Sequence, residues 1–60
     1  DQRDPVETRT NLAAAYLDNQ QPTDARTAVL QALETAPGYL RAQDILLRAV
    51  EQMRNSSGAQ

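Results

Sequence analysis

The stretch from Leu12 to Pro37 constrains the fold more than any other part of the chain. Small and large side chains alternate at helical spacing in two segments, which a polar turn at residues 19–21 separates. The small positions are Ala13, Ala25 and Ala32, and the large ones are Leu12, Tyr16 and Val29. Alanine leaves room for a second helix to approach closely, and the larger side chains fill the gaps that remain. The pattern therefore predicts two helices that pack against each other.

Start and stop signals place three helices, at about 5–18, 22–35 and 39–54. Asp4 can cap the first helix, and proline suits the first helical position at Pro5 and Pro22. Pro37 ends the second helix because it disfavours helical geometry at the residue before it. We expect Gly38 to permit the reversal into the third helix. Short connections make consecutive helices antiparallel, so the sequence predicts an all-α fold of three antiparallel helices.

The apolar residues of the second and third segments recur at three- and four-residue spacing, which is typical of a buried helix face. In the second segment these are Ala25, Ala28, Val29, Ala32 and Leu33. In the third they are Ala42, Ile45, Leu46, Ala49, Val50 and Met53. Asp44 and Arg48 form a favourable pair four residues apart. We expect residues 1–54 to form one unit and residues 55–60, which begin Asn-Ser-Ser-Gly, to be a flexible tail.

The alternation of small and large residues and the closing Pro37 resemble the tetratricopeptide repeat, a helix–turn–helix unit of about 34 residues that stacks into solenoids. An offset of 34 residues aligns Leu46 with Leu12 and Val50 with Tyr16, so the third helix resembles the first half of a second repeat. The resemblance implies about one and a half repeats, with a terminal helix that caps the last hairpin. The sequence departs from the family at Arg9, where a large apolar residue is usual, and at Leu47, where a small one is usual.

Composition excludes several classes of function. The chain has no cysteine, histidine or lysine, so it lacks the usual zinc ligands, thiol nucleophiles and Schiff-base amines. It also has no glycine-rich loop for phosphates. We therefore expect no enzyme activity, no metal and no cofactor. The net charge is −2, with the six arginines dispersed, which argues against nucleic acid as a partner. No apolar run is long enough to insert into a membrane.

Tetratricopeptide arrays bind extended peptides or partner helices in a concave groove, which the first helix of each repeat lines. By this resemblance, the best candidates for contacting a protein partner are Asn11, Leu17, Arg41, Asp44 and Arg48. Glu7, Thr10, Ala14 and Ile45 are further groove-facing positions. Amide and guanidinium groups supply directed donors for a peptide backbone or a carboxylate. The alternative is that these side chains are ordinary solvated surface.

The sequence therefore suggests a protein–protein interaction or scaffold module at the C-terminal end of a longer tetratricopeptide array. Because the chain begins at Asp1 rather than Met, we expect it to be a piece of a longer protein. One alternative is a self-associating module in which the uncovered edges of the repeats pair between copies to give a homo-oligomer. Another is an accessory segment of an enzyme or polysaccharide-export protein whose functional domain lies outside these residues.

Overall fold

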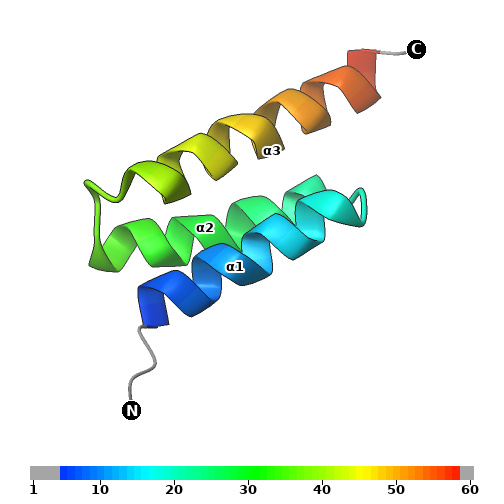
Figure 1. Cartoon of the computed structure of the whole chain (residues 1–60). Helices are drawn as coiled ribbons and strands as arrows, with labels where there is room; N and C mark the ends of the chain where they lie inside the picture. The colour runs from blue at the N-terminus through cyan, green and yellow to red at the C-terminus, as the bar shows by residue number, and fades with distance from the viewer. Residues whose placement is uncertain (1–4, 59–60) are drawn as a thin grey trace.

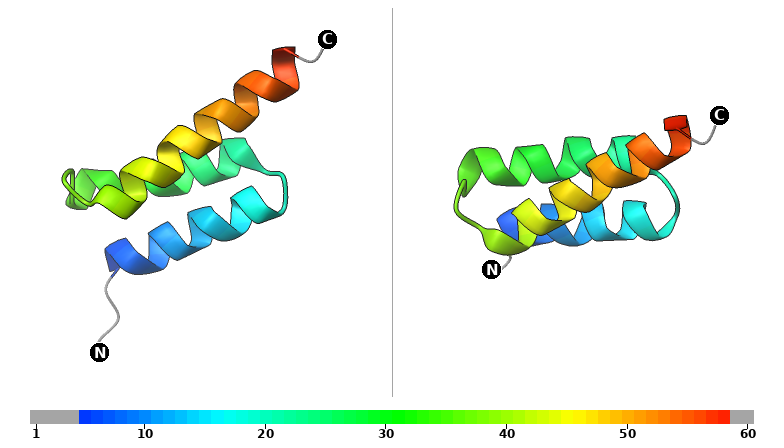
Figure 2. Two further views of the ribbon diagram at one scale, coloured as in Figure 1. Left: turned by 45° about the horizontal axis from the view of Figure 1, so that its top comes forward. Right: turned by 90° about the horizontal axis from the view of Figure 1, so that it is seen from above.

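The computed structural model describes residues 5–58, which form three helices and, within that range, no strand. Helix α1 spans Pro5–Asp18, α2 spans Pro22–Thr35 and α3 spans Leu40–Gly58. Consecutive helices run antiparallel, and α3 lies obliquely across the layer that α1 and α2 form (Figures 1 and 2). The predicted all-α architecture is confirmed, while the cap expected at Asp4 lies outside the described residues.

The turn between α1 and α2 uses a residue with left-handed backbone geometry. The amide of Gln21 donates to the carbonyl of Tyr16 at 2.8 Å, and the amide of Gln20 donates to the carbonyl of Leu17 at 3.0 Å. These two bonds form a Schellman motif, which closes the C-terminal end of a helix. Gln20 has a φ of 63°, in the region that glycine occupies most easily. The motif reverses the chain and allows Pro22 to start α2 at once.

The connection between α2 and α3 relies on proline rather than on glycine. Helix α2 ends at Thr35, as the position of Pro37 predicts. The amide of Tyr39 donates to the carbonyl of Ala36 at 3.1 Å, and the side-chain Nε2 of Gln43 donates to the carbonyl of Pro37 at 2.8 Å. Gly38 does not have a positive φ, and a Cβ built on it would meet no atom within 4 Å. The reversal at Gly38 therefore uses no backbone conformation that is special to glycine.

Helix α3 is longer than the sequence indicated. It continues beyond Arg54 as far as Gly58, so the prediction of a flexible tail from residue 55 is wrong for residues 55–58. Residues 59 and 60 lie outside the described part of the chain. Serine and asparagine are weak helix formers, but they do not block a helix as proline does. In this chain the helix formed by the preceding residues continues through them to Gly58.

The core consists mainly of alanine. Six alanines, Val29 and Ile45 are buried, and Val29 is the largest side chain among them that is fully buried. The alanines are Ala13, Ala25, Ala28, Ala32, Ala42 and Ala49. Larger side chains such as Tyr16, Leu33 and Leu46 pack around this centre and remain partly exposed. Close approach of the helices, rather than a large apolar volume, therefore holds the fold together.

Two residues expected in the core are instead exposed. Leu12 on α1 is 47% exposed, and Val50 on α3 is 36% exposed. Helical periodicity shows that such residues share a face with others, but it cannot show which faces a neighbouring helix covers. Both residues lie on helix sides that no other helix of the described chain contacts closely enough to bury them. The prediction that they are buried within this unit is wrong.

Candidate functional site

A hollow of about 380 Å³ lies between the C-terminal halves of α1 and α3. Because α3 crosses the α1–α2 layer obliquely, it moves away from α1 toward its own C-terminus (Figure 2). The lining residues come only from these two helices: Ala14, Leu17, Asp18, Ile45, Arg48, Glu51, Gln52 and Asn55. The hollow thus lies between the first and third helices.

The hollow has an apolar base and a polar rim. Ile45 is only 5% exposed and belongs to the core, and Ala14 and Leu17 pack partly against that core. Ile45, Arg48, Gln52 and Asn55 follow one another at three- and four-residue spacing, so they lie along one side of α3. Leu17 and Asp18 lie three and four residues after Ala14, at the end of α1. A ligand in this hollow would therefore contact apolar atoms below and polar groups along both sides.

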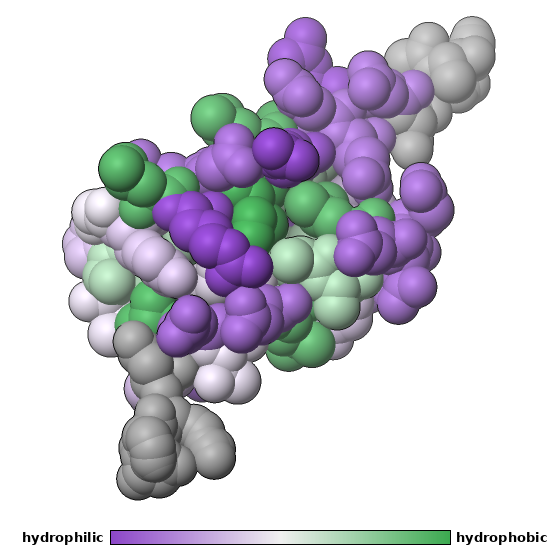
Figure 3. Space-filling model, in the orientation of Figure 1, coloured by the Kyte–Doolittle hydropathy of each residue, from purple (hydrophilic) through white to green (hydrophobic). Residues whose placement is uncertain are grey.

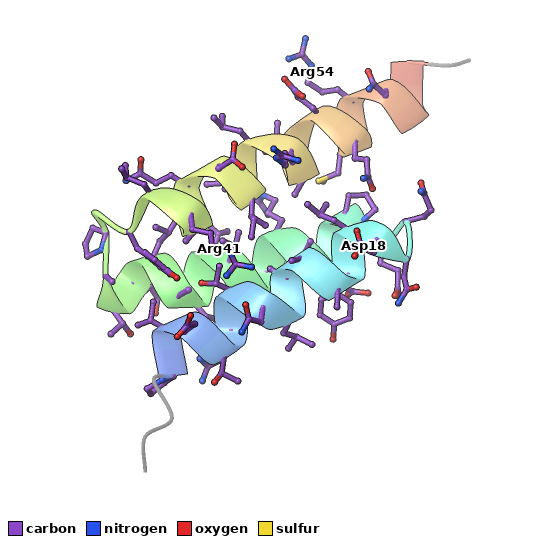
Figure 4. The ribbon with its side chains drawn as sticks, viewed as in Figure 1. Asp18, Arg41 and Arg54 are labelled. Atoms are coloured by element: carbon purple, nitrogen blue, oxygen red, sulfur yellow. The ribbon has the colours of Figure 1, made fainter. Side chains whose placement is uncertain are left out.

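The rim of the hollow carries more negative than positive charge. Asp18 and Glu51 contribute two carboxylates, and Figure 4 shows Asp18 at the end of α1. The last turn of α1 contains no basic residue, so the negative end of its helix dipole is not offset there. Arg48 supplies the positive charge, and its Nε donates to Oδ2 of Asp44 at 2.9 Å. Both partners of this ion pair are more than half exposed, so a ligand can compete for Arg48 at little cost.

Gln52 gives the hollow an unused hydrogen-bond acceptor. Its Oε1 atom is buried and has no hydrogen-bond partner within the part of the chain that the structure describes. A buried acceptor without a partner costs free energy, and a donor that reaches it removes this cost. Backbone amides and the nitrogen groups of lysine, arginine, asparagine and glutamine are suitable donors. A ligand in the hollow would bond this atom only if the Gln52 side chain turned its Oε1 toward the ligand.

A second polar contact joins the same two helices nearer their other ends. Nη1 of Arg41 on α3 donates to Oδ1 of Asn11 on α1 at 2.8 Å, and both side chains are exposed. Figure 4 shows the Arg41 side chain extending from α3 toward α1. The bond ties α3 to α1 at a point where the helices are closer than they are at the hollow. It is a direct side-chain link between α1 and α3 beside the hollow.

The structure distributes the predicted contact residues over three places. Leu17 and Arg48 line the hollow, and Ala14 and Ile45 line it with them. Asn11 and Arg41 form the bond beside it, and Asp44 is the ion-pair partner of Arg48. Glu7 instead lines a separate shallow hollow with Val6, Ala36, Gly38 and Tyr39. Thr10 is fully buried, and its hydroxyl donates to the carbonyl of Val6 at 2.7 Å, so the prediction that it faces the groove is wrong.

Four lining residues were missed by the sequence reasoning: Asp18, Glu51, Gln52 and Asn55. Three of them lie one or two turns after Arg48 on α3, and spacing alone could have extended the groove to Gln52. The sequence predicts that the third helix ends at Arg54, which places Asn55 in the tail. Asp18 belongs to the hollow only because the two helices diverge at an angle that the sequence does not specify.

The described residues contain no group of three or more histidine, cysteine, aspartate or glutamate side chains that could hold a metal ion. No described helix combines the length and apolar character needed to cross a bilayer. Comparisons with protein-family models, with curated proteins and with solved structures give no match to this chain.

Proposed function

We propose that this chain is a protein-interaction module of the tetratricopeptide type, which holds a peptide or a partner helix in the hollow between α1 and α3. The observation that carries the proposal is the composition of that hollow, with an apolar base, an exposed ion pair and the unpartnered Oε1 of Gln52. A peptide can supply both a donor for Gln52 and apolar atoms for the base of the hollow, since it offers backbone N–H groups beside apolar side chains. On an ordinary solvated helix surface, water would satisfy such an acceptor.

The exposed side of α1 supports a place at the C-terminal end of a longer stack. An offset of 34 residues aligns Leu12 of α1 with Leu46 of α3. Leu46 packs against the core, beside the buried residues Ala42, Ile45 and Ala49. Leu12 is 47% exposed and, with Pro5, Thr8 and Arg9, lines a shallow hollow on the outer side of α1. A preceding helix that packed on α1 as α2 packs on α3 would cover Leu12.

The chemistry of the hollow favours one class of peptide. Asp18, Glu51 and the C-terminal end of α1 favour a positive or neutral segment over an acidic one. Arg48 adds a positive charge to the same hollow, but the carboxylate of Asp44 already offsets that charge. We therefore propose a ligand that places an N–H donor on Gln52 and an apolar side chain against Leu17.

We also propose that the chain has no catalytic role. It contains no histidine, cysteine or lysine, so acid–base chemistry would depend on carboxylates. Three carboxylates on the helices, Glu34, Asp44 and Glu51, could in principle act as acids or bases, but all three are exposed. Exposed side chains of this kind are ordinary solvated surface, which favours a surface role.

Selection of peptides tests the proposal and does not require that the natural partner be identified first. A displayed library of random twelve-residue peptides would be selected on the immobilised chain, and the enriched peptides titrated by calorimetry. We expect the enriched peptides to be neutral or basic. Arg48→Ala should weaken their binding roughly tenfold to hundredfold, because a lost hydrogen bond to a charged group costs about 1.5–3 kcal/mol.

Arg26 provides the matched control, because it is an exposed arginine on α2, which does not line the hollow. Arg26→Ala should leave the affinity unchanged. An effect of Arg26→Ala without an effect of Arg48→Ala would place the binding face elsewhere. Failure of the library to yield any peptide that binds would contradict the proposed function itself.

A further inference from the structure

The two carboxylates on the rim of the hollow have no positive partner within the described chain. Asp18 is the last residue of α1, Glu51 lies on the C-terminal half of α3, and both side chains are exposed. Neither makes an ion pair or a side-chain hydrogen bond with another described residue. The cation of the hollow, Arg48, bonds instead to Asp44, which does not line the hollow. The hollow therefore presents uncompensated negative charge to a ligand.

The end of α1 adds to this negative potential. Its last turn contains no basic residue, so the partial negative charge of the helix dipole is not offset there. Across the hollow, Asn55 lies one turn after Glu51 on α3 and adds an amide oxygen that can accept a hydrogen bond. Figure 3 shows hydrophilic surface where α1 ends and along the C-terminal half of α3. The acceptors thus gather at the end of the hollow where the two helices have diverged (Figure 2).

The base of the hollow suits the stem of a long basic side chain. Ala14 and Leu17 of α1 and Ile45 of α3 form an apolar floor, and Leu17 directly precedes Asp18. Figure 3 shows apolar surface between α1 and α3. A long basic side chain lays its methylene groups on apolar surface and keeps its charged end near water or a counter-ion. An apolar floor that leads to an acidic rim is complementary to such a side chain in both parts.

We propose that the hollow holds an arginine side chain of the partner peptide, with its guanidinium between Asp18 and Glu51 and its methylene groups on the apolar floor. This inference rests on the proposed function, since it requires a peptide in the same hollow. The acceptors lie on two helices, and a guanidinium carries several N–H donors in fixed directions that can reach both. The ammonium of lysine is more compact and more strongly hydrated, so it fits an acidic rim above an apolar floor less well.

Arg48 leaves room for the charge of a second arginine. It lies one turn before Glu51 on α3, toward the end of the hollow where α1 and α3 are closer. Its own charge is offset by Asp44, whose Oδ2 lies 2.9 Å from the Arg48 Nε. The arginine of the ligand thus occupies the wide end of the hollow, while Arg48 can donate to a peptide carbonyl at the narrow end.

Peptides selected from a random twelve-residue library on the immobilised chain test this inference. We expect the peptides that bind to share an arginine. Replacing that arginine by citrulline, which keeps the shape of the side chain but removes its charge, should weaken binding roughly tenfold in calorimetric titrations. Replacing it by lysine should weaken binding about threefold, because the charge remains and the directed donors are lost.

Variants of the chain locate the guanidinium. Asp18→Asn and Glu51→Gln should each weaken the arginine peptide about threefold, and together roughly tenfold, because each exposed ion pair contributes modestly. The affinity for the citrulline peptide should not change, since it has no charge for the carboxylates to bind. Glu34→Gln is the matched control, because it removes an exposed carboxylate from α2, which does not line the hollow. It should leave both affinities unchanged.

Selected peptides that lack arginine would overturn the inference, as would a citrulline or lysine peptide that binds as tightly as the arginine peptide. So would a loss of affinity in Glu34→Gln equal to that in Asp18→Asn, because the effect of charge would then be general. If Arg48→Ala weakens the selected peptides and citrulline does not, the hollow is still the binding site and only the arginine is wrong. A library that yields no binding peptide would contradict the proposed function and this inference together.

Discussion

Arg41 and Asn11, which are 30 residues apart in the sequence, join α3 directly to α1 through a hydrogen bond of 2.8 Å. The bond lies on the exposed side of the molecule, beside the hollow but outside its lining. Beyond this point α3 diverges from α1, and the hollow opens between them. The hydrogen bond thus joins the two helices that line the hollow, at a point just beside it.

A double-mutant cycle measures the strength of this connection. Because both side chains are exposed, we expect Asn11→Ala and Arg41→Ala each to lower the free energy of unfolding by less than about 1 kcal/mol. The coupling between them should be about 0.5 kcal/mol in urea titrations. Additive effects of the two substitutions would show that the bond does not form in solution.

The alanine core predicts a strong dependence on side-chain size at Ala13. Ala13 is fully buried, so Ala13→Leu should overpack the core and lower the free energy of unfolding by about 1–3 kcal/mol. Ala15→Leu is the matched control, since Ala15 is an exposed alanine of the same helix. Its stability should change by less than about 0.5 kcal/mol. Equal melting temperatures for the two variants would contradict the packing described for α1.

The left-handed residue at the first turn offers a stabilising substitution. Gln20 occupies a backbone conformation that costs residues with a Cβ roughly 1–2 kcal/mol and costs glycine nothing comparable. Gln20→Gly should therefore raise the free energy of unfolding by about 0.5–1 kcal/mol, after the added entropy of the unfolded chain is subtracted. Thermal unfolding followed by circular dichroism measures this change. A lower melting temperature would mean that the turn does not adopt the Schellman geometry.

The opposite substitution is expected to stabilise the second turn. Gly38 does not have a positive φ, and a methyl group there would meet no neighbouring atom. Gly38→Ala should raise the free energy of unfolding by about 0.4–1 kcal/mol, because alanine reduces the freedom of the unfolded chain. The same thermal measurement applies, with Gln20→Ala as the contrasting variant that should not be stabilised. A destabilised Gly38→Ala would show that the turn needs glycine after all.

The three helices could be predicted from the sequence because their boundaries carry strong local signals. Pro5, Pro22 and Pro37 mark two helix starts and one end, and the structure places α1 and α2 within the predicted ranges. The end of α3 was missed because Asn55 and the serines after it only weaken a helix, and no proline follows them. Local propensity thus predicted the helix boundaries correctly where proline marks them. It failed at the end of α3, where the residues only weakly disfavour a helix.

The candidate site could be predicted only in part. The resemblance named Leu17 and Arg48 as groove residues, and both line the hollow between α1 and α3. It could not supply the divergence of those helices, which brings Asp18 and Gln52 into the hollow. Nor could it show that Thr10 satisfies its hydroxyl on the carbonyl of Val6 and remains buried. These features depend on the angle between helices, which side-chain packing sets.

The most direct test of the proposed function is a map of amide chemical shifts as a selected peptide is added to the ¹⁵N-labelled chain. We predict that the largest changes fall on Leu17, Arg48 and Gln52, including the side-chain amide of Gln52, while Arg26 on α2 is unaffected. The Gln52→Leu variant, which removes the unpartnered acceptor, should fold normally and bind the peptide more weakly. Changes centred on α2, with Arg48 and Gln52 unmoved, would contradict the assignment of the hollow between α1 and α3 as the binding site.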